Sequence, residues 1–251
     1  MRIVKDLVDR DMAYEVDGTV YFEVSKFANY GKLSRFSKEE MIALSKERGA
    51  DPEDPNKKTP LDFILWQKAK PGEPTWDSPW GKGRPGWHIE CSSMIYDYLG
   101  ARIDIHGGGE DLIYPHHESE IAQSESFTGK SPFVNYFLHT GSVGYHTEKM
   151  SKSLGNLIMV SELLKQYSPN AIRYLLLSRK WDDPWEYRDS DIEKAAKKVE
   201  ELNNTNNKTG KLEDFIAVLE NNLNTRGALK ILPTLPKNDF KVAAEILGFK
   251  L

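Results

Sequence analysis

Cysteine is almost absent from this 251-residue chain, which contains only Cys91. A single cysteine cannot form an internal disulfide, so Cys91 is a free thiol, a metal ligand or a nucleophile. Long apolar runs are also missing: none approaches the ~20 residues that span a bilayer, and the first residues contain no signal-peptide core. We therefore expect a cytoplasmic protein with no membrane partner.

The chain also has no excess of positive charge. The chain has 34 Lys and Arg against 38 Asp and Glu, a formal net charge of −4. A domain that binds nucleic acid by itself is usually basic. If this chain handles RNA, we expect it to need residues that lie outside these 251. No internal repeat has a solenoid period, so a repeat architecture is excluded.

Local turn and capping chemistry predicts several elements of the fold. Asp17-Gly18, between two alternating apolar segments, predicts a β-hairpin. Ser37 followed by Glu40 is a capping box and predicts the start of a helix. A further helix is expected to begin at about Trp87 and to end at Gly100, because glycine is favoured just beyond a helix.

Beyond Gly100, helical and extended segments alternate. RIDIH at 102–106 predicts a strand, the glycines at 107–109 a tight loop, and Pro115 the first residue of the next helix. This alternation with short connections is typical of an α/β fold. From Ser161, which we expect to cap a helix, the pattern is helical to the end and predicts a small bundle.

Cys91, His116 and Glu120 form a candidate zinc site. His116 and Glu120 are four residues apart, so their side chains share one helix face. A thiolate, an imidazole and a carboxylate are ligands that zinc accepts. The alternative is a buried cysteine packed as a small hydrophobe and a surface His–Glu hydrogen bond. Trp87, one turn before Cys91, forms an aromatic wall beside the site or packs in an ordinary core.

The glycines after His106 form a candidate phosphate-binding segment. Gly107, Gly108 and Gly109 follow a predicted strand, where they let a phosphorylated ligand approach the backbone amides. The spacing is not that of a dinucleotide or Walker fingerprint. The alternative is a tight turn without a ligand.

A second candidate for phosphate chemistry is the run KMSKS. It consists of Lys149, Met150, Ser151, Lys152 and Ser153. The two lysines could stabilise charge that develops on a departing pyrophosphate, while the serine hydroxyls bind phosphate oxygens. The alternative is a solvated loop rich in lysine and serine.

Together these segments resemble the class I aminoacyl-tRNA synthetases, and within them the cysteinyl-tRNA synthetase family. The matching segments are PGEPTWDSPWG at 71–81, GRPGWHIECS at 83–92, DIHGGGEDLIYPHHESEIAQSE at 104–125 and EKMSKSLGN at 148–156. They occur in family order, and the resemblance covers residues 1 to about 235.

The resemblance implies an α/β fold that contains the C-terminal half of a class I Rossmann-type nucleotide-binding domain. Residues 1–82 would form the connective insertion that precedes it, and residues 83–156 the second half of the catalytic domain. Residues 157–189 would form a stem-contact helical segment, and residues 190–251 a truncated helical bundle.

The resemblance also implies roles for individual residues. Cys91, His116 and Glu120 would be three of four ligands of one zinc ion per subunit, which binds the thiolate of the substrate cysteine. Zinc prefers a soft thiolate to a hydroxyl, so such a site selects cysteine over serine. Trp87 would line the substrate pocket, and His106 with Gly107 and Gly108 would lie near the adenylate.

The KMSKS residues complete the implied ATP site. Lys149 and Lys152 would be catalytic, and Met150, Ser151 and Ser153 would help to bind ATP. The implied substrates and partners are cysteine, ATP with Mg and tRNA-Cys, and the implied state is a monomer.

Two family features are missing. No His-x-Gly-His motif occurs in the chain, and no second cysteine completes the zinc site. We therefore expect a chain that begins inside the connective insertion, either a fragment or one half of a split enzyme that needs a separate N-terminal half. Such a chain is expected to be inactive alone.

Two other interpretations stay open. One is the related ligase that joins activated cysteine to an amino sugar in mycothiol synthesis, although we expect that relative to lack a carboxylate at the position of Glu120. The other is a non-catalytic binding module that keeps the synthetase fold without its chemistry.

Overall fold

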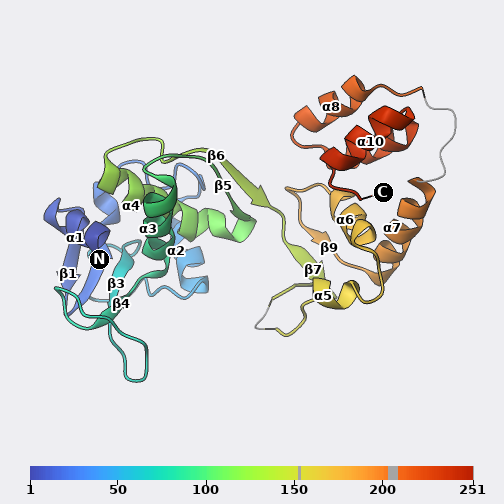
Figure 1. Cartoon of the computed structure of the whole chain (residues 1–251). Coiled ribbons are helices and arrows are strands. Elements are labelled where there is room, and N and C mark those ends of the chain that lie inside the picture. Colours follow the sequence, from blue (N-terminus) through green and yellow to red (C-terminus); the bar gives the residue numbers. More distant parts are fainter. Residues whose placement is uncertain (152–153, 203–208, 251) are drawn as a thin grey trace. The chain divides into compact units, whose positions relative to one another are not determined.

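The computed structural model describes residues 1–151, 154–202 and 209–250. The chain forms two compact units, Met1–His139 and Thr140–Leu251 (Figure 1). Both units mix helices with short strands. The strand Trp185–Glu186 lies inside the segment after Ser161 that the sequence predicts to be helical throughout; it pairs with a strand about 40 residues earlier, which the local pattern does not reveal. The four-part division of the chain inferred from the resemblance stays a prediction.

The first unit contains two sheets. Its elements in chain order are α1 (Arg2–Asp9), β1 (Ala13–Val16), β2 (Thr19–Phe22), α2 (Lys38–Glu47), β3 (Phe63–Lys68), β4 (Gly83–Pro85), α3 (Trp87–Leu99), β5 (Ile103–Gly109), α4 (Glu118–Thr128) and β6 (Val134–Thr140). Strands β1 to β4 form one antiparallel sheet in sequential order, and β5 pairs with β6.

Three locally encoded predictions are confirmed. Asp17 and Gly18 both have positive φ, at 49° and 81°, as the hairpin turn between β1 and β2 requires. The capping box opens α2: the Glu40 amide donates to Ser37 Oγ at 3.2 Å, and the Ser37 amide donates to Glu40 Oε2 at 2.7 Å. Gly100 follows α3 with φ of 96°.

The glycines at 107–109 do not form a tight loop. They continue β5, which runs from Ile103 to Gly109 beside β6. A Cβ placed at Gly107 would lie 3.7 Å from the carbonyl oxygen of Leu138 in β6. Pairing with a distant strand therefore overrides the local turn preference of glycine, and that strand could not be identified from the glycines themselves.

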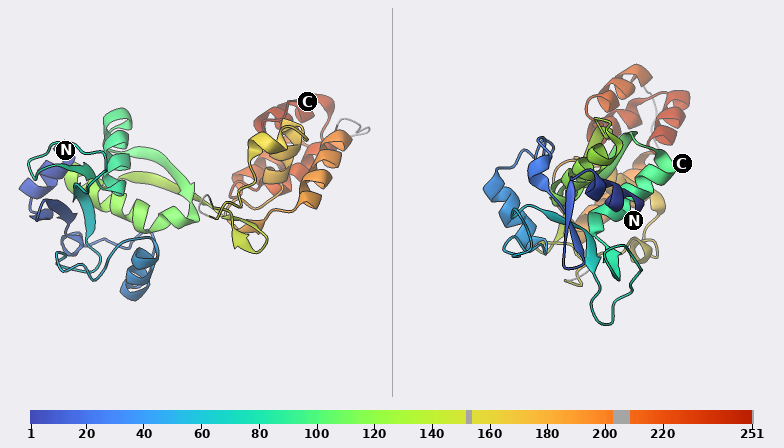
Figure 2. Two further views of the ribbon diagram at one scale, coloured as in Figure 1. Left: turned by 90° about the horizontal axis from the view of Figure 1, so that it is seen from below. Right: turned by 90° about the vertical axis from the view of Figure 1, so that its left-hand side faces the viewer.

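Two apolar cores hold the first unit together. The larger one joins α1 to the four-stranded sheet, with Leu7, Phe22 and Leu65 completely buried. The smaller one joins β5 and β6 to α4 through Ile103 and Ile121. Figures 1 and 2 show α3 and α4 beside each other, in agreement with the contacts between them.

The second unit combines a small sheet with helices. Its elements are β7 (Val143–Tyr145), β8 (Glu148–Lys149), α5 (Val160–Leu163), α6 (Pro169–Leu177), β9 (Trp185–Glu186), α7 (Asp189–Leu202), α8 (Leu212–Glu220), α9 (Thr225–Ile231) and α10 (Lys237–Ile246). Strand β7 pairs antiparallel with β8 and parallel with β9. Two apolar clusters, one centred on α6 and α7 and one on α8 to α10, form its interior.

One helix start in this unit differs from the prediction. Ser161 lies inside α5, whose N-cap is Met159, and so does not cap it. Met159 has no side-chain oxygen and makes no capping hydrogen bond, so capping chemistry could not mark this start. The next helix, α6, begins at Pro169 and is capped by Ser168, whose hydroxyl accepts a hydrogen bond from the Ala171 amide at 3.2 Å.

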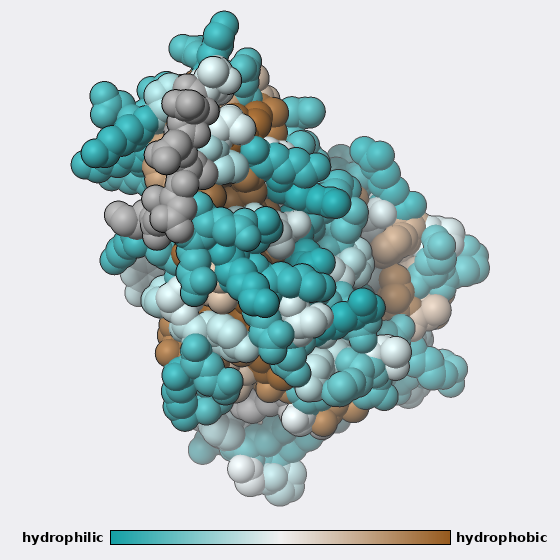
Figure 3. Space-filling view, turned by 90° about the vertical axis from the view of Figure 1, so that its right-hand side faces the viewer, coloured by the Kyte–Doolittle hydropathy of each residue, from teal (hydrophilic) through white to brown (hydrophobic). Residues whose placement is uncertain are grey.

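Hydrophilic residues cover most of the face shown in Figure 3, and hydrophobic residues form small separate patches on it. Among the described residues, no helix is both long and apolar enough to cross a membrane.

Gly86 lets the backbone just before α3 approach the backbone of β3 closely, and this contact fixes the start of α3. Its amide donates to the Leu65 carbonyl at 2.9 Å, and a Cβ at this position would lie 2.0 Å from the Ile64 carbonyl oxygen. Its φ of −69° suits any residue, so glycine is required here for space and not for conformation.

We therefore expect Gly86→Ala to lower the free energy of unfolding of the first unit by about 1–3 kcal/mol, the usual cost of overpacking. Gly107→Ala is the matched control, because its Cβ would make only an ordinary contact at 3.7 Å. Urea unfolding followed by tryptophan fluorescence measures both, since four of the six tryptophans, at 66, 76, 80 and 87, lie in this unit. Equal midpoints for the two variants would contradict the steric argument.

Candidate metal centre

Helix α3 supplies one wall of the candidate site. Its N-terminal end carries Trp87, His88 and Cys91, and the contact of Gly86 with β3 fixes where the helix begins. His88 is buried and Cys91 is half-buried, whereas Trp87 is 57% exposed. The start of α3 thus presents an aromatic ring, an imidazole and a thiol together.

The opposite wall is the helical segment Ile113–His117, which contains Pro115, together with α4, which follows it directly. Tyr114 has an extended backbone, with φ of −137° and ψ of 138°, and interrupts the helical geometry just before Pro115. The Tyr114 hydroxyl is hydrogen-bonded to Ser45 Oγ at 2.9 Å in the interior. The following turn carries His116 and continues into α4, which carries Glu120.

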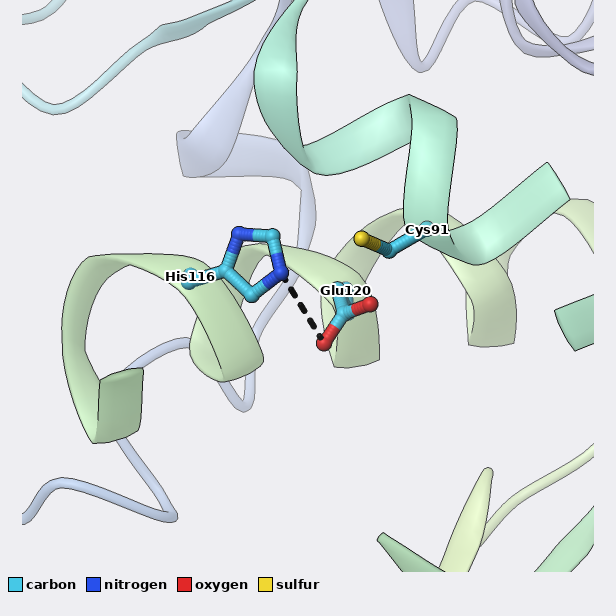
Figure 4. A group of neighbouring side chains, drawn as sticks. All are labelled: Cys91, His116 and Glu120. Atoms are coloured by element: carbon cyan, nitrogen blue, oxygen red, sulfur yellow. Dashed lines mark ion pairs between the residues drawn. The ribbon is translucent and has the colours of Figure 1, made fainter. Parts of the chain in front are cut away.

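The structure brings Cys91, His116 and Glu120 together. Figure 4 shows the three side chains converging from α3 and from the helix that continues into α4. One potential ligand atom from each lies within 4.8 Å of the other two. The distance from His116 Nε2 to Glu120 Oε2 is 3.8 Å. His116 is 5% exposed and Glu120 is completely buried, so neither is a surface residue.

The buried carboxylate of Glu120 is only partly satisfied. Its Oε2 is 2.8 Å from His106 Nε2, but its Oε1 has no hydrogen-bond partner among the described residues. A buried, unpaired carboxylate oxygen is costly unless a cation or a donor meets it. The donor set and this oxygen therefore fit a divalent metal ion with nitrogen, sulfur and oxygen ligands.

A second set of ligand atoms shares Glu120. His106, His117 and Glu120 also bring one such atom each within 4.8 Å of the others. The rings of His106 and His117 lie with centroids 4.3 Å apart. The sequence suggested a place near an adenylate for His106, and in the structure its imidazole contacts the carboxylate of the candidate metal site.

The sequence did not indicate that His88, His117 and His139 lie at this centre. His88 Nδ1 lies 2.9 Å from His116 Nδ1, and His117 Nδ1 lies 2.8 Å from His139 Nε2. With His106, these residues are five of the six histidines in the chain. The only local signals were the pair His116-His117 and the position of His88 one turn before Cys91 in the sequence.

Burial favours the neutral form of four of these histidines. Loss of solvent, followed by the charge of the neighbouring imidazoles, lowers the pKa of His88 and of His117 to about 3. Burial also lowers the pKa of His116 and of His139. Neutral imidazole is the form that binds metals.

The pKa of the Cys91 thiol is shifted upward, in the opposite direction to the pKa values of these histidines. Burial raises the pKa of the Cys91 thiol, and the carboxylates of Glu120 and Glu90 raise it further. Among these protein groups alone, Cys91 therefore stays protonated at neutral pH. A bound divalent cation would favour the thiolate instead.

The KMSKS run lies in the second unit. Lys149 ends β8, and the Met150 amide donates to the Val143 carbonyl at 2.9 Å while its side chain packs against the core of this unit. The Ser151 amide donates to Asn156 Oδ1 at 2.8 Å. Lys152 and Ser153 lie outside the described residues.

Trp87 packs against the centre. Its ring centroid lies 4.9 Å from that of His116 and 5.7 Å from that of His88. The aromatic wall suggested by the sequence is thus present at the metal candidate, on its exposed side.

Comparisons with known proteins identify the family to which these residues belong. Residues 1–197 match the family model described as the catalytic domain of class I (C) tRNA synthetases. The chain is 47% identical over 247 residues to the cysteine–tRNA ligase of Dehalococcoides mccartyi strain BAV1, covering 98% of this chain and 52% of that protein. It is 52% identical over 205 residues to the cysteine–tRNA ligase of Carboxydothermus hydrogenoformans, covering 81% of this chain and 43% of that protein.

The chain thus spans about half the length of the curated relatives it matches. Among solved structures, it is similar to the methionyl-tRNA synthetase of Mycobacterium tuberculosis, with a TM-score of 0.53 and 16% identity over 94% of this chain and 57% of that one. This likeness concerns the fold alone. The match to the family model over most of the chain shows that it belongs to the class I tRNA synthetases of the cysteine type.

Proposed function

We propose that this chain is part of a cysteine–tRNA ligase, which activates cysteine with ATP and Mg to cysteinyl-adenylate and transfers the cysteine to tRNA-Cys. The family match and relatives about half identical to this chain support the proposal. We expect the whole enzyme to be a cytoplasmic monomer. The chain is about half of such an enzyme by length, so the missing portion has to be supplied for activity.

The observation that carries the proposal is the convergence of Cys91, His116 and Glu120 beside the unpaired Oε1 of Glu120. These residues would hold one zinc ion per subunit, with the fourth position supplied by the portion of the enzyme outside this chain. When bound, zinc supplies a soft Lewis acid that prefers a thiolate to a hydroxyl. The exposed ring of Trp87 would line the pocket for the substrate side chain.

Activation of the carboxyl group of the substrate cysteine by ATP would use other residues. We assign ATP and adenylate binding to His106, Gly107 and Gly108 of β5 and to the KMSKS run. Lys149 and Lys152 would stabilise the negative charge on the departing pyrophosphate. Gly107 is exposed and has no side chain, which supports this assignment because a phosphorylated ligand could approach β5 closely there.

Metal analysis tests the zinc assignment directly. We expect the purified 251-residue chain to bind zinc and His116→Ala to lose at least about tenfold in affinity, the usual scale for a damaged metal site. His146→Ala is the matched control, because this exposed histidine lies in the second unit. Inductively coupled plasma mass spectrometry after dialysis against a zinc buffer measures both.

A cobalt-substituted sample gives a readout that depends on the ligand sulfur. We expect a thiolate-to-cobalt charge-transfer band that disappears in Cys91→Ser. The absence of zinc from the native chain, or equal zinc loss in the two histidine variants, would remove the ligand assignment. Such a result would favour a non-catalytic module.

The catalytic proposal is tested by complementation. The portion of the D. mccartyi relative that this chain does not cover is supplied as a second polypeptide, and cysteine-dependent ATP–pyrophosphate exchange is measured. We expect exchange from the mixture and a preference for cysteine over serine on the order of 10⁴, because selection by a specific ligand bond exceeds what size alone provides.

Glu120→Gln should abolish this preference while Glu110→Gln, outside the candidate ligand sets, should keep it. A folded complex without exchange would contradict the proposal. Transfer to an amino sugar in preference to tRNA-Cys would point to the mycothiol-type ligase instead.

A further inference from the structure

His88 is a buried histidine that lies against one of the candidate zinc ligands. Its side chain is 9% exposed, and its Nδ1 lies 2.9 Å from Nδ1 of His116. The centroids of the two rings are 5.1 Å apart. A hydrogen bond between two ring nitrogens needs one proton between them, so one of these imidazoles donates and the other accepts. Which of them donates decides what His116 can do at the metal centre.

The His88 ring is held firmly between β3 and α4. The contact of Gly86 with β3 fixes the start of α3 just before it. The His88 carbonyl accepts a hydrogen bond from Gln123 Nε2 of α4 at 2.7 Å. The ring itself packs edge to face against Phe63 of β3, with the centroids 5.6 Å apart. Nδ1 of His88 therefore has a defined position opposite His116.

The two ring nitrogens of His116 have different surroundings. Nδ1 faces His88, whereas Nε2 lies 3.8 Å from Glu120 Oε2, where the side chain of Cys91 also converges (Figure 4). Nε2 is therefore the atom with which His116 would bind zinc. A metal ligand needs a free lone pair, so the proton of a neutral, metal-binding His116 has to be on Nδ1.

The same tautomer of His116 is favoured when no metal is bound. A separation of 3.8 Å is too long for a hydrogen bond, so a proton on Nε2 would not be donated to Glu120. The nearer oxygen of Glu120 is already paired with His106 Nε2 at 2.8 Å. A proton on Nδ1, in contrast, has an acceptor in His88 at 2.9 Å. A buried donor with an acceptor is more favourable than one without.

This arrangement requires His88 to accept through Nδ1 and to carry its own proton on Nε2. Nε2 of His88 is not among the buried atoms that lack a partner. His88 also lines a cavity of about 460 Å³ at the start of α3, in which solvent can accept that proton. Both nitrogens of His88 are thus satisfied in the tautomer that accepts from His116.

We propose that His88 is a positioning residue of the metal centre, which accepts the Nδ1 proton of His116 and keeps the Nε2 lone pair of His116 directed at the zinc ion. Such a bond to the remote nitrogen fixes the tautomer and orientation of a metal-binding histidine and raises its basicity. A neutral acceptor also adds no negative charge to a centre that already contains the carboxylate of Glu120. The inference rests on the proposed function, because it takes His116 to be a zinc ligand.

The tautomer of His116 can be measured in the chain without metal. Two-bond ¹⁵N–¹H correlation spectra of the ¹⁵N-histidine-labelled chain distinguish the two tautomers, and single substitutions assign the signals of its six histidines. We expect His116 to be protonated on Nδ1 in the native chain. We expect the same in His88→Asn, whose side-chain oxygen can accept that proton. In His88→Leu the acceptor is lost, and the form protonated on Nε2 should appear.

Zinc affinity measures the consequence for the metal centre, by competition with a fluorescent zinc chelator. We expect His88→Leu to bind zinc about 10 to 100 times more weakly than the native chain, the usual effect of losing such a hydrogen bond. His88→Asn should lie closer to the native chain than to His88→Leu. His139→Leu is the matched control and should keep the native affinity, because His139 belongs to the same cluster but is hydrogen-bonded to His117. Variants are compared only when their thermal unfolding matches that of the native chain.

The possible failures can be told apart. Native zinc affinity in His88→Leu, or an unchanged tautomer of His116 in that variant, would overturn the inference and leave the proposed function intact. An affinity of His88→Asn as low as that of His88→Leu, or an equal loss in His139→Leu, would show that the ring acts only by packing and would also overturn it. A native chain that binds no zinc would contradict the proposed function, and the positioning role would fail with it.

Discussion

A completely buried carboxylate organises the functional half of this structure. Glu120 has no contact with solvent, yet one of its oxygens has no partner among the described residues. The other oxygen is held by His106, and His116 and His117 lie within 4 Å of it. Burying a carboxylate in this way is unfavourable unless a positive charge compensates it. The arrangement of histidines and thiol around it fits a cation, which supports the zinc proposal.

The helix that carries Glu120 is unusual in its composition. Most of α4 is buried, although much of it is polar, and each of three neighbours of Glu120 has specific partners. Glu118 accepts from the Leu33 and Ser34 amides at 3.2 and 2.9 Å. Gln123 donates to the His88 carbonyl at 2.7 Å and to Ser92 Oγ at 2.6 Å. Glu125 accepts from the Phe133 amide at 3.0 Å. The Gln123 bonds tie α4 to α3, and the bonds of Glu118 and Glu125 tie it to the segments before α2 and before β6.

How much could be predicted from the sequence depended on the range of the interaction. The turn at Asp17-Gly18 and the capping box at Ser37 depend on neighbouring residues, and both predictions are confirmed. The glycines at 107–109 pair with a strand about 30 residues later, so their extended conformation was missed.

Contacts between residues far apart in the sequence also limited the prediction of the candidate metal centre. Cys91, His116 and Glu120 were grouped because zinc accepts these three residue types and because His116 and Glu120 are four residues apart. The family resemblance then implied that Cys91 lies beside them. His88 and His139 were missed because each contacts the centre only through a partner more than 20 residues away, at distances of 2.9 and 2.8 Å. The polar composition of α4 also gives no amphipathic signal by which its burial could be recognised.

Under the zinc proposal, the dependence of α4 on its partners would make metal binding and folding of the first unit one linked equilibrium. An isolated helix of 11 residues is marginal in water, and here its polar side chains are satisfied only by distant segments of the chain. The ligand atoms therefore come together only in the folded unit, and any ion they hold stabilises that unit by mass action. The concentration of free metal would then regulate how long this part of the protein survives proteolysis, in addition to its catalytic capacity.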